Sequence, residues 1–348
     1  MTLMEWQCYQ IAGSSFHFGR QGLGGEVCSV SLPSDSLFAA MTANAAALMD
    51  DAEFSEWIAP FQKGEPSFFL TSAFPMAGEL RFFPKPLASR RTSAPVDSSF
   101  LKKLKKISYL SEKLFFRMLA GESLDALLKD AEIFQGGSAL VSKNELDLLP
   151  EAVRKEKRIW SAEKRPRVTL DRETNASMIY FTGYTRFAEG CGLWFALREN
   201  TPDISGTLGR IFEDLSVSGL GGSRGIGFGS CAISPAGTLD LPEAGEGPWV
   251  TLSRYIPAAD EMAALADGKS SYSIESVGGW LYSAGIKAER RKIVSMLAEG
   301  SVLGSCAKHT PGTLADVQPV YNGTAPVGHP VFRNGFAAPV GFSFGEEA

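Results

Sequence analysis

The sequence predicts an α+β protein made of two ferredoxin-like domains, the first of which carries a long insertion. Two observations support this prediction. Once an insertion of about 81–165 is set aside, the elements expected in residues 1–240 follow the order strand, helix, strand, strand, helix, strand, as in a split βαβ unit. A linker rich in Pro, Gly and Glu at 241–248 then leads to a weaker pattern of the same kind over 249–348.

Each element of the first domain rests on a local pattern. Alternation of apolar and polar residues over 5–11 predicts a strand. The alanine-rich stretch 34–49 predicts a helix, for which Ser34 is the expected N-cap and Asp35 complements the positive end. Apolar residues that recur on one face predict a second helix at 204–216. The remaining strands are expected at 67–71, 177–185, 193–198 and 226–233.

The insertion is expected to be partly helical and basic. Between Arg81 and Arg117 there are ten Lys or Arg and two acidic residues, although the whole chain has a net charge of −5. A helical pattern over 100–120 places four lysines on its outer side, namely Lys102, Lys103, Lys105 and Lys106. A solvated helix face has the same pattern, but such charge asymmetry can also mark a surface for a polyanion.

A glycine-rich loop at 219–229 lies between the second helix and the closing strand. Six of its eleven residues are glycine, so its backbone can lie flat against a large ligand and point successive N–H groups outward. Arg224 suits a phosphate, and the ring of Phe228 suits a base or packs inward. Neither a Walker lysine nor a G-x-G-x-x-G register is present, so the usual nucleotide-cofactor motifs are absent.

Composition limits the class of protein. Five cysteines are scattered without a C-x-x-C pair, which indicates reduced thiols in a cytoplasmic protein. With three histidines and no second ligand at helical spacing, we expect neither a metal nor a cofactor. No apolar run approaches the ~18 residues of a membrane helix, so no membrane contact is expected.

Eight different short sequence blocks are spread along nearly the whole chain, and their order and spacing are specific. They lie at 16–19 (FHFG), 32–38 (LPSDSLF), 69–75 (FLTSAFP), 83–86 (FPKP), 167–172 (RVTLDR), 221–229 (GGSRGIGFG), 299–302 (EGSV) and 329–335 (HPVFRNG). In these blocks the sequence resembles the fourth subunit of the type III-A CRISPR effector, the Csm complex. That family belongs to the RAMP superfamily of RNA-binding proteins.

The resemblance implies a non-catalytic subunit with two RRM-like domains that acts in antiviral defence. Such a subunit holds the 5′ handle of the CRISPR RNA and joins the large polymerase-palm subunit to the backbone RAMP subunit of the filament. Target RNA is met only indirectly. The analogous subunit of a neighbouring type III complex is an alternative with nearly the same role.

Charge patterns and the resemblance together give the candidate RNA-binding residues. For the block 32–38 two explanations are equally good. Ser34 and Asp35 are helix caps, or they lie close to the RNA at a helix N-terminus that accepts a phosphate. The candidates are His17, Gly19, Arg20, Ser34, Asp35, Ser36, Lys102, Lys103, Lys105, Lys106, Arg167, Arg172, Gly221, Gly222, Ser223, Arg224, Gly225, Phe228 and Arg333.

His17 leaves an enzymatic alternative open. Related processing proteins cleave RNA by metal-independent general acid–base chemistry, so His17 is also a candidate acid or base of an endoribonuclease that matures precursor CRISPR RNA. The other two histidines, His309 and His329, are far away in the sequence. We therefore favour a non-catalytic role for His17, as a hydrogen-bond donor to RNA or as support beneath the glycine loop.

Overall fold

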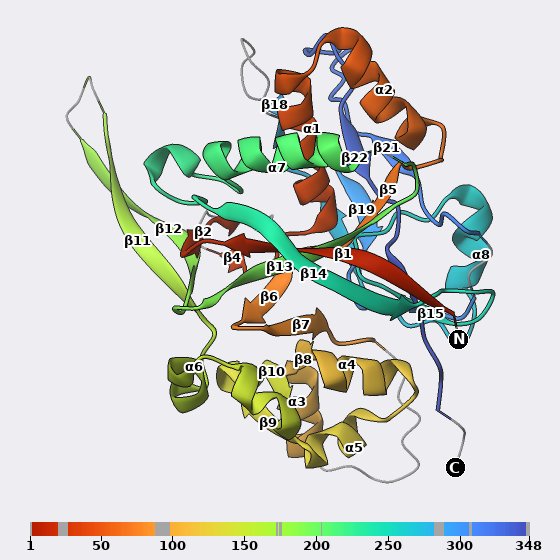
Figure 1. Cartoon of the computed structure of the whole chain (residues 1–348). Helices are drawn as coiled ribbons and strands as arrows, with labels where there is room; N and C mark the ends of the chain where they lie inside the picture. Colours follow the sequence, from red (N-terminus) through yellow and green to blue (C-terminus); the bar gives the residue numbers. More distant parts are fainter. Residues whose placement is uncertain are drawn as a thin grey trace.

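A nine-stranded sheet forms the centre of the computed structural model, which describes residues 2–19, 27–87, 98–171 (98–101 as backbone), 173, 176–202, 204–281, 289–305 and 308–345 (Figure 1). One part of the sheet has the order β14-β1-β13-β6, and every pair in it is antiparallel. Its strands are β1 (Leu3–Ala12), β5 (Phe68–Leu70), β6 (Phe74–Ala77), β13 (Cys191–Glu199) and β14 (Ala232–Pro242), with β5 paired to β13. The predicted order of elements is confirmed for this part, except that the strand expected at 177–185 belongs to a separate three-stranded sheet.

Three helices lie on one face of these strands, with α7 running along β1 and β14 (Figure 1). They are α1 (Ser34–Leu48), α2 (Asp51–Gln62) and α7 (Ser205–Ser218). The expected apolar face of α7 is confirmed, because its buried residues recur at helical spacing: Leu208, Ile211, Phe212 and Leu215. The predicted cap of α1 is wrong. Pro33 occupies the N-cap, and the Ser34 hydroxyl instead accepts a hydrogen bond from the Arg254 amide at 2.9 Å.

Both faces of the sheet are covered, which explains the continuous apolar run of β13. Trp194 and Ala196 belong to the core on one face, whereas Phe195 and Leu197 pack into the core beneath α1 and α7. Successive side chains of a strand point to opposite faces, so a strand buried on both sides needs apolar residues at every position.

The insertion continues the same sheet instead of forming a separate body (lower part of Figure 1). Its strands are β7 (Leu80–Pro84), β8 (Tyr109–Ser111), β9 (Ala131–Phe134) and β10 (Ala139–Ser142). Its helices are α3 (Ser98–Lys106), α4 (Glu112–Leu119), α5 (Leu124–Lys129), α6 (Glu151–Glu156) and the 3₁₀ turns η1 (Gln135–Gly137) and η2 (Lys143–Leu148). The single helix expected over 100–120 is wrong, because β8 interrupts it to pair with β7 and β10.

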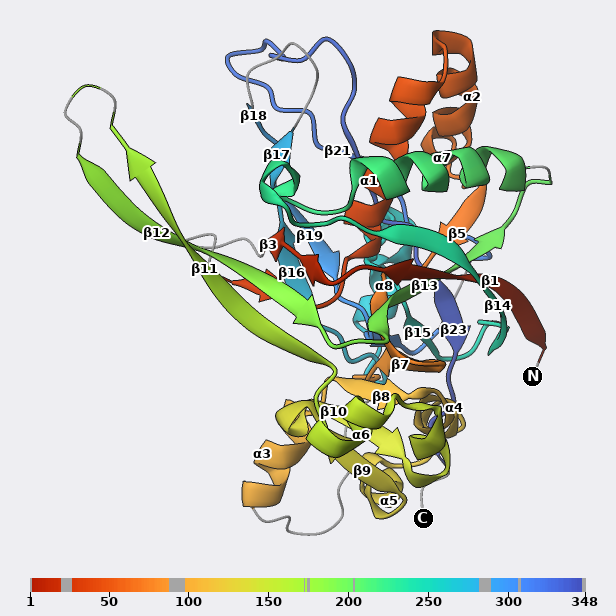
Figure 2. The same ribbon diagram turned by 60° about the vertical axis from the view of Figure 1, so that its left-hand side comes forward.

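A long hairpin leaves the body between the insertion and the central strands (Figures 1 and 2). It consists of β11 (Trp160–Leu170) and β12 (Ser177–Phe187), paired without a bulge from Trp160↔Phe187 to Leu170↔Ser177. At its base β12 also pairs with β2 (Ser15–Phe16), and β3 (Phe18–Gly19) pairs with β4 (Cys28–Ser29) beside it. The closing strand expected at 226–233 begins later, at Ala232, so residues 226–229 belong to the glycine loop and 230–231 connect it to β14.

The C-terminal part forms several small sheets. β15 (Trp249–Thr251) lies between β20 (Val302–Leu303) and β23 (Pro339–Gly341). The two-stranded pairs are β16 (Ile274–Val277) with β19 (Val294–Leu297), β17 (Trp280–Leu281) with β18 (Glu289–Arg290), and β21 (Leu314–Asp316) with β22 (Phe332–Asn334). The short helices are η4 (Ala259–Glu261) and α8 (Met262–Leu265). A second ferredoxin-like sheet is therefore not confirmed among the described residues.

The C-terminal part also shares its core with the central sheet. Val250 and Val340 pack in the same apolar cluster as Trp6 of β1 and Leu114 of the insertion. Of the helices that the structure describes, none has the length and apolar character needed to cross a membrane.

Candidate RNA interface

The glycine loop, residues 219–229, is closed on itself directly after α7. The Leu220 amide donates to the Gly229 carbonyl at 2.9 Å, and the chain returns through the short 3₁₀ turn η3 (Arg224–Ile226). Gly229 has φ +80°, and a Cβ there would lie 2.1 Å from the Leu220 carbonyl oxygen. Glycine is therefore required at this crossing, where two backbone segments meet.

The loop is seated on the segment that carries His17. The Gly222 amide donates to the His17 carbonyl and the Gly229 amide donates to the Ser15 carbonyl, both at 2.9 Å. A Cβ on Gly222 would approach His17 Cδ2 at 2.9 Å. The half-buried imidazole thus lies directly beneath the loop, which fits support of the loop, one of the two non-catalytic roles expected from the sequence.

His17 is held from the other side by the base of the hairpin. Its Nδ1 donates to the Gly183 carbonyl at 2.6 Å and lies 3.2 Å from Sγ of Cys28. Burial raises the pKa of the Cys28 thiol to about 11, so this thiol stays neutral. In the described part of the chain, no group of three or more His, Cys, Asp or Glu side chains is placed to hold a metal ion.

Phe228 packs inward, the second of the two placements considered for its ring. It is 2% exposed and lies 4.8 Å from the Tyr184 ring of β12. The Arg165 guanidinium covers both rings, with Cζ 4.9 Å from the centre of Phe228 and 5.5 Å from that of Tyr184. Such cation–π contacts hold a charged group against an apolar surface while its N–H groups stay available.

A short hydrogen bond fixes this aromatic pair. The Tyr184 hydroxyl donates to Glu163 at 2.5 Å, which raises the pKa of Tyr184 and lowers the pKa of Glu163. Arg165, Tyr184 and Glu163 were missed in the sequence. One sequence signal could have found Arg165. Residues 163, 165 and 167 of a strand lie on one face, so Arg165 shares its face with the candidate Arg167.

Two more arginines meet the loop. Arg224 Nη1 donates to the carbonyls of Ser218 and Gly219, at 3.1 and 3.3 Å, and so caps the C-terminal end of α7. Arg167 Nη2 donates to the Ile226 carbonyl at 3.3 Å. Arg165, Arg167 and Arg224 form no ion pair with the residues that the structure describes.

Part of the loop backbone is also free to bind. The amides of Ser223, Arg224 and Gly225 make no hydrogen bond with the described residues, and the last two residues are exposed. Gly19 and Gly221 are exposed nearby. Adjacent free N–H groups and three unpaired guanidinium groups together make an anion-binding surface.

Other predicted residues are buried elsewhere. Asp35 pairs with Arg333 of β22, and Arg333 Nη2 donates to the Gly278 carbonyl at 2.7 Å. Asp35 and Arg333 are 1% and 3% exposed, and Ser34 is likewise buried, while the hydroxyl of half-buried Ser36 lies 3.5 Å from Asp35 Oδ2. This cluster joins α1 to the C-terminal part, and the side chains of Ser34, Asp35 and Arg333 in it do not reach the surface.

The lysines of α3 form a separate group. Lys102, Lys103, Lys105 and Lys106 are all exposed, but they lie in the insertion, away from the glycine loop (Figures 1 and 2). Arg20 and Arg172 lie outside the described residues.

Two family models match the chain over most of its length. The CRISPR Csm4 C-terminal domain matches residues 245–342, and the CRISPR-associated protein Cas_Cmr3 matches residues 63–234. The CRISPR system Cms protein Csm4 of Mycobacterium tuberculosis is 27% identical and covers 89% of this chain and 93% of its own. The protein of the same name from Thermococcus onnurineus is 25% identical, with 90% and 92% covered.

Solved structures agree in fold. A chain of the Csm3–Csm4 subcomplex of the type III-A interference complex aligns with a TM-score of 0.64 at 18% identity, covering 97% of this chain and 99% of its own. A chain of the Csm1–Csm4 cassette in complex with cA4 aligns with a TM-score of 0.56 at 20% identity, covering 99% and 100%. The family model of the C-terminal part and the curated relatives agree with the resemblance of the short blocks, and the chain is a Csm4 subunit of a type III CRISPR complex.

Proposed function

We propose that this chain is a non-catalytic subunit that holds the 5′ handle of the CRISPR RNA on the glycine loop and the base of the β11–β12 hairpin. The observation that supports this most is that Arg165, Arg167 and Arg224 gather at one loop, in which the amides of Ser223, Arg224 and Gly225 have no hydrogen-bond partner among the described residues. Backbone amides and guanidinium groups bind phosphates regardless of base, which suits a strand that must be held in place.

The predicted residues named here divide into three roles in this proposal. Gly19, Gly221, Gly222, Ser223, Arg224 and Gly225, with Arg167, lie on or beside the loop surface and contact RNA. His17 and Phe228 support the loop from below. Asp35, Ser34 and Arg333 act indirectly, because their buried network joins α1 to β22.

The chain further joins the large polymerase-palm subunit to the backbone RAMP subunit in this proposal. Support comes from the relatives, whose solved assemblies pair Csm4 with Csm1 in one case and with Csm3 in the other. The hairpin offers a surface for such contacts. On the face opposite to Arg165 and Arg167, Val168 lies across from Ile179 and Pro166 lies across from Phe181. The side chains of Val168, Ile179 and Phe181 are exposed there.

Guide RNA that co-purifies with the complex tests the proposal. The tagged chain is co-expressed with the other subunits and a CRISPR array, carrying either Arg165→Glu with Arg224→Glu or the control Arg210→Glu on the exposed side of α7. The double variant should retain much less RNA per complex, and the control should match the wild type. Equal RNA content in both would refute the loop assignment. Repeat RNA cut in EDTA, with cutting abolished by His17→Ala, would instead establish the enzyme.

A further inference from the structure

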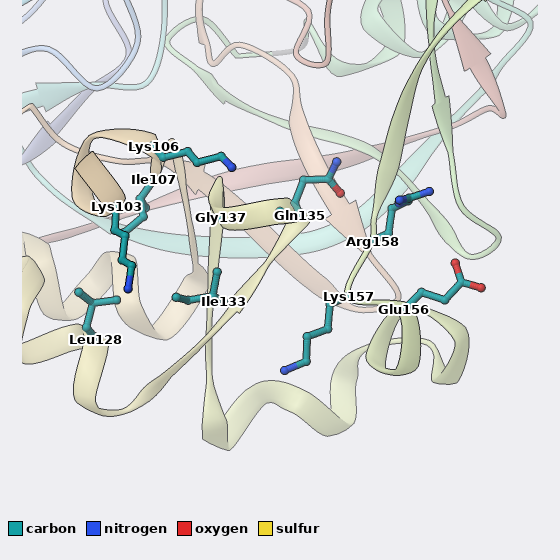
Figure 3. A pocket seen from close by; sticks show the side chains of 11 residues that line it. Lys103, Lys106, Ile107, Leu128, Ile133, Gln135, Gly137, Glu156, Lys157 and Arg158 are labelled. Atoms are coloured by element: carbon teal, nitrogen blue, oxygen red, sulfur yellow. The ribbon is translucent and has the colours of Figure 1, made fainter. Parts of the chain in front are cut away.

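A pocket of about 860 Å³ lies in the insertion, at the foot of the hairpin (Figure 3). Four segments build it: the end of α3 with Ile107, α5, β9 with the turn η1, and residues 156–158 at the end of α6. Its size is within the range of small-ligand sites in proteins. The glycine loop contributes nothing to it, so it is a site separate from the interface described above.

The rim of the pocket is strongly basic. Lys103, Lys106, Lys157 and Arg158 line it, against one acidic residue, Glu156. Lys157 is engaged by Glu132, with Nζ 2.9 Å from the carboxylate. The other three cations have no ion-pair partner in the part of the chain that the structure describes. A cluster of like charges that no carboxylate neutralises favours an anionic ligand.

The floor is apolar and partly open to solvent. Ile133 is 47% exposed although it is a large aliphatic residue, and Ile107 and Leu128 line the pocket with it. In Figure 3 the Ile133 side chain lies between Lys103 and Lys157. A phosphate group gains nothing from contact with an apolar floor. The face of a nucleobase, in contrast, packs well against such a surface.

The shape of the pocket is fixed by one turn. The Gln135 side chain accepts hydrogen bonds from the amides of Ile159 and Trp160, at 2.9 and 3.2 Å, and donates to the Trp160 carbonyl at 2.7 Å. Gly137 has φ +105°, and a Cβ there would lie 3.1 Å from Cδ of Lys106. The turn thereby positions both the Lys106 stem and the first residue of β11.

We propose that this pocket binds one unpaired nucleotide of a single-stranded RNA, with the base on Ile133 and the flanking phosphates on Lys103, Lys106 and Arg158. The proposal rests on the proposed RNA-binding function and adds a second, remote point of contact to it. An acidic protein segment would satisfy the cations but would leave Ile133 without a planar partner.

The helix α3 supplies its own control. Lys103→Ala with Lys106→Ala removes two pocket cations, and Lys102→Ala with Lys105→Ala removes two equally exposed cations from the same helix outside the pocket. Binding of a short fluorescein-labelled single-stranded RNA to the assembled complex is measured over a range of salt. The first pair should weaken binding and reduce the slope of log K against log salt by about 1.4, and the second pair should do much less. Equal effects of the two pairs would mean that the helix attracts RNA only through its overall positive charge, and would refute the proposed nucleotide site in the pocket.

Ile133→Ser tests the base. We expect about ten-fold weaker binding with an unchanged salt slope, because the substitution removes stacking surface and no charge. Binding as tight as the wild type would overturn the proposal, as would displacement of the RNA by a polyglutamate peptide that depends on Lys103 and Lys106. If the pocket variants bind normally while Arg165→Glu with Arg224→Glu releases the guide, the pocket fails and the proposed function stands.

Discussion

The guanidinium carbon of Arg165 lies 4.9 Å from the centre of the Phe228 ring, so a residue of the projecting hairpin covers the glycine loop. The two residues are far apart in the sequence, yet the contact fixes how the hairpin leaves the body. It also leaves the Arg165 side chain exposed to solvent next to the free loop amides.

Neutralising these arginines should change the salt dependence of RNA binding. Arg165→Gln and Arg224→Gln should each reduce the slope of log K against log salt by about 0.7, the value for one phosphate of a single strand. Titration of single-stranded RNA at several salt concentrations measures this. Arg224→Lys keeps the positive charge but loses the guanidinium that caps α7, so it separates the two roles. If the slope falls as much for Arg224→Lys as for Arg224→Gln, Arg224 does not contact a phosphate.

The crossing of the glycine loop should be intolerant of a side chain. Gly229→Ala places a Cβ against the Leu220 carbonyl at a positive φ, and we expect at least about 1–2 kcal/mol of destabilisation. Gly225→Ala is the matched control, since nothing lies within 4 Å of its Cβ position. Thermal unfolding compares the two. A control that is equally destabilised would mean that the loop is not held by this crossing.

The buried pair of Asp35 and Arg333 should matter more than a surface pair. Arg333→Met removes the direct ion-pair partner of the buried Asp35 carboxylate and leaves only the more distant charges of Arg254 and Arg291, which costs about 3–5 kcal/mol. Arg154→Met removes a partner of the fully exposed Asp147 and should cost about 0–1 kcal/mol. Denaturant unfolding measures both, and similar losses would show that water reaches the Asp35 site.

Alkaline pH should destabilise the protein through its thiols. Burial raises the pKa of Cys8, Cys28 and Cys231 to about 11 and that of Cys191 to about 12, from the ordinary thiol value of 9.0. The unfolded chain therefore loses these protons first, so stability is unaffected below pH 9.0 and falls as pH rises through 9.0 toward 11. Unfolding curves from pH 7 upward measure the loss, which Cys191→Ala should reduce. A curve that stays flat above pH 9.0 would contradict the burial of these thiols.

The apolar face of the hairpin should serve assembly and not folding. Val168→Ser with Ile179→Ser changes two exposed cross-strand neighbours, so we expect unchanged thermal stability and a lower yield of the intact complex. Thr169→Ser with Thr182→Ser, on the opposite face, is the control. Normal assembly of the first variant would place the partner contacts elsewhere.

Local patterns predicted much of the fold. The face of α7, the strand β13 and the order of elements around the sheet each follow from periodicities within one segment. The closing strand was expected to begin at 226, because Ile226 and Phe228 alternate like strand residues. In the structure Phe228 is instead buried in the loop and packs beneath Arg165. The helix expected over 100–120 failed because β8 is stabilised by pairing with strands 25 or more residues away, not by its own sequence.

The candidate site was predicted less completely. The glycine loop stands out in the sequence because six of its eleven residues are glycine. Arg165 was missed, and Asp35 and Arg333 were read as RNA contacts, because nothing in either segment reveals that they pair across 298 positions. Charge in a sequence does not distinguish a buried counter-ion from an exposed ligand.

That pairing has a consequence for synthesis. A ribosome releases the N-terminal segments first, so α1 is made long before the counter-ion that neutralises its first turn. The late β-strands also complete the apolar cluster around Trp6. Translation must therefore pass Arg333 before the earliest segments can reach their final packing, and products that stall or terminate before it should be recognised by chaperones and proteases.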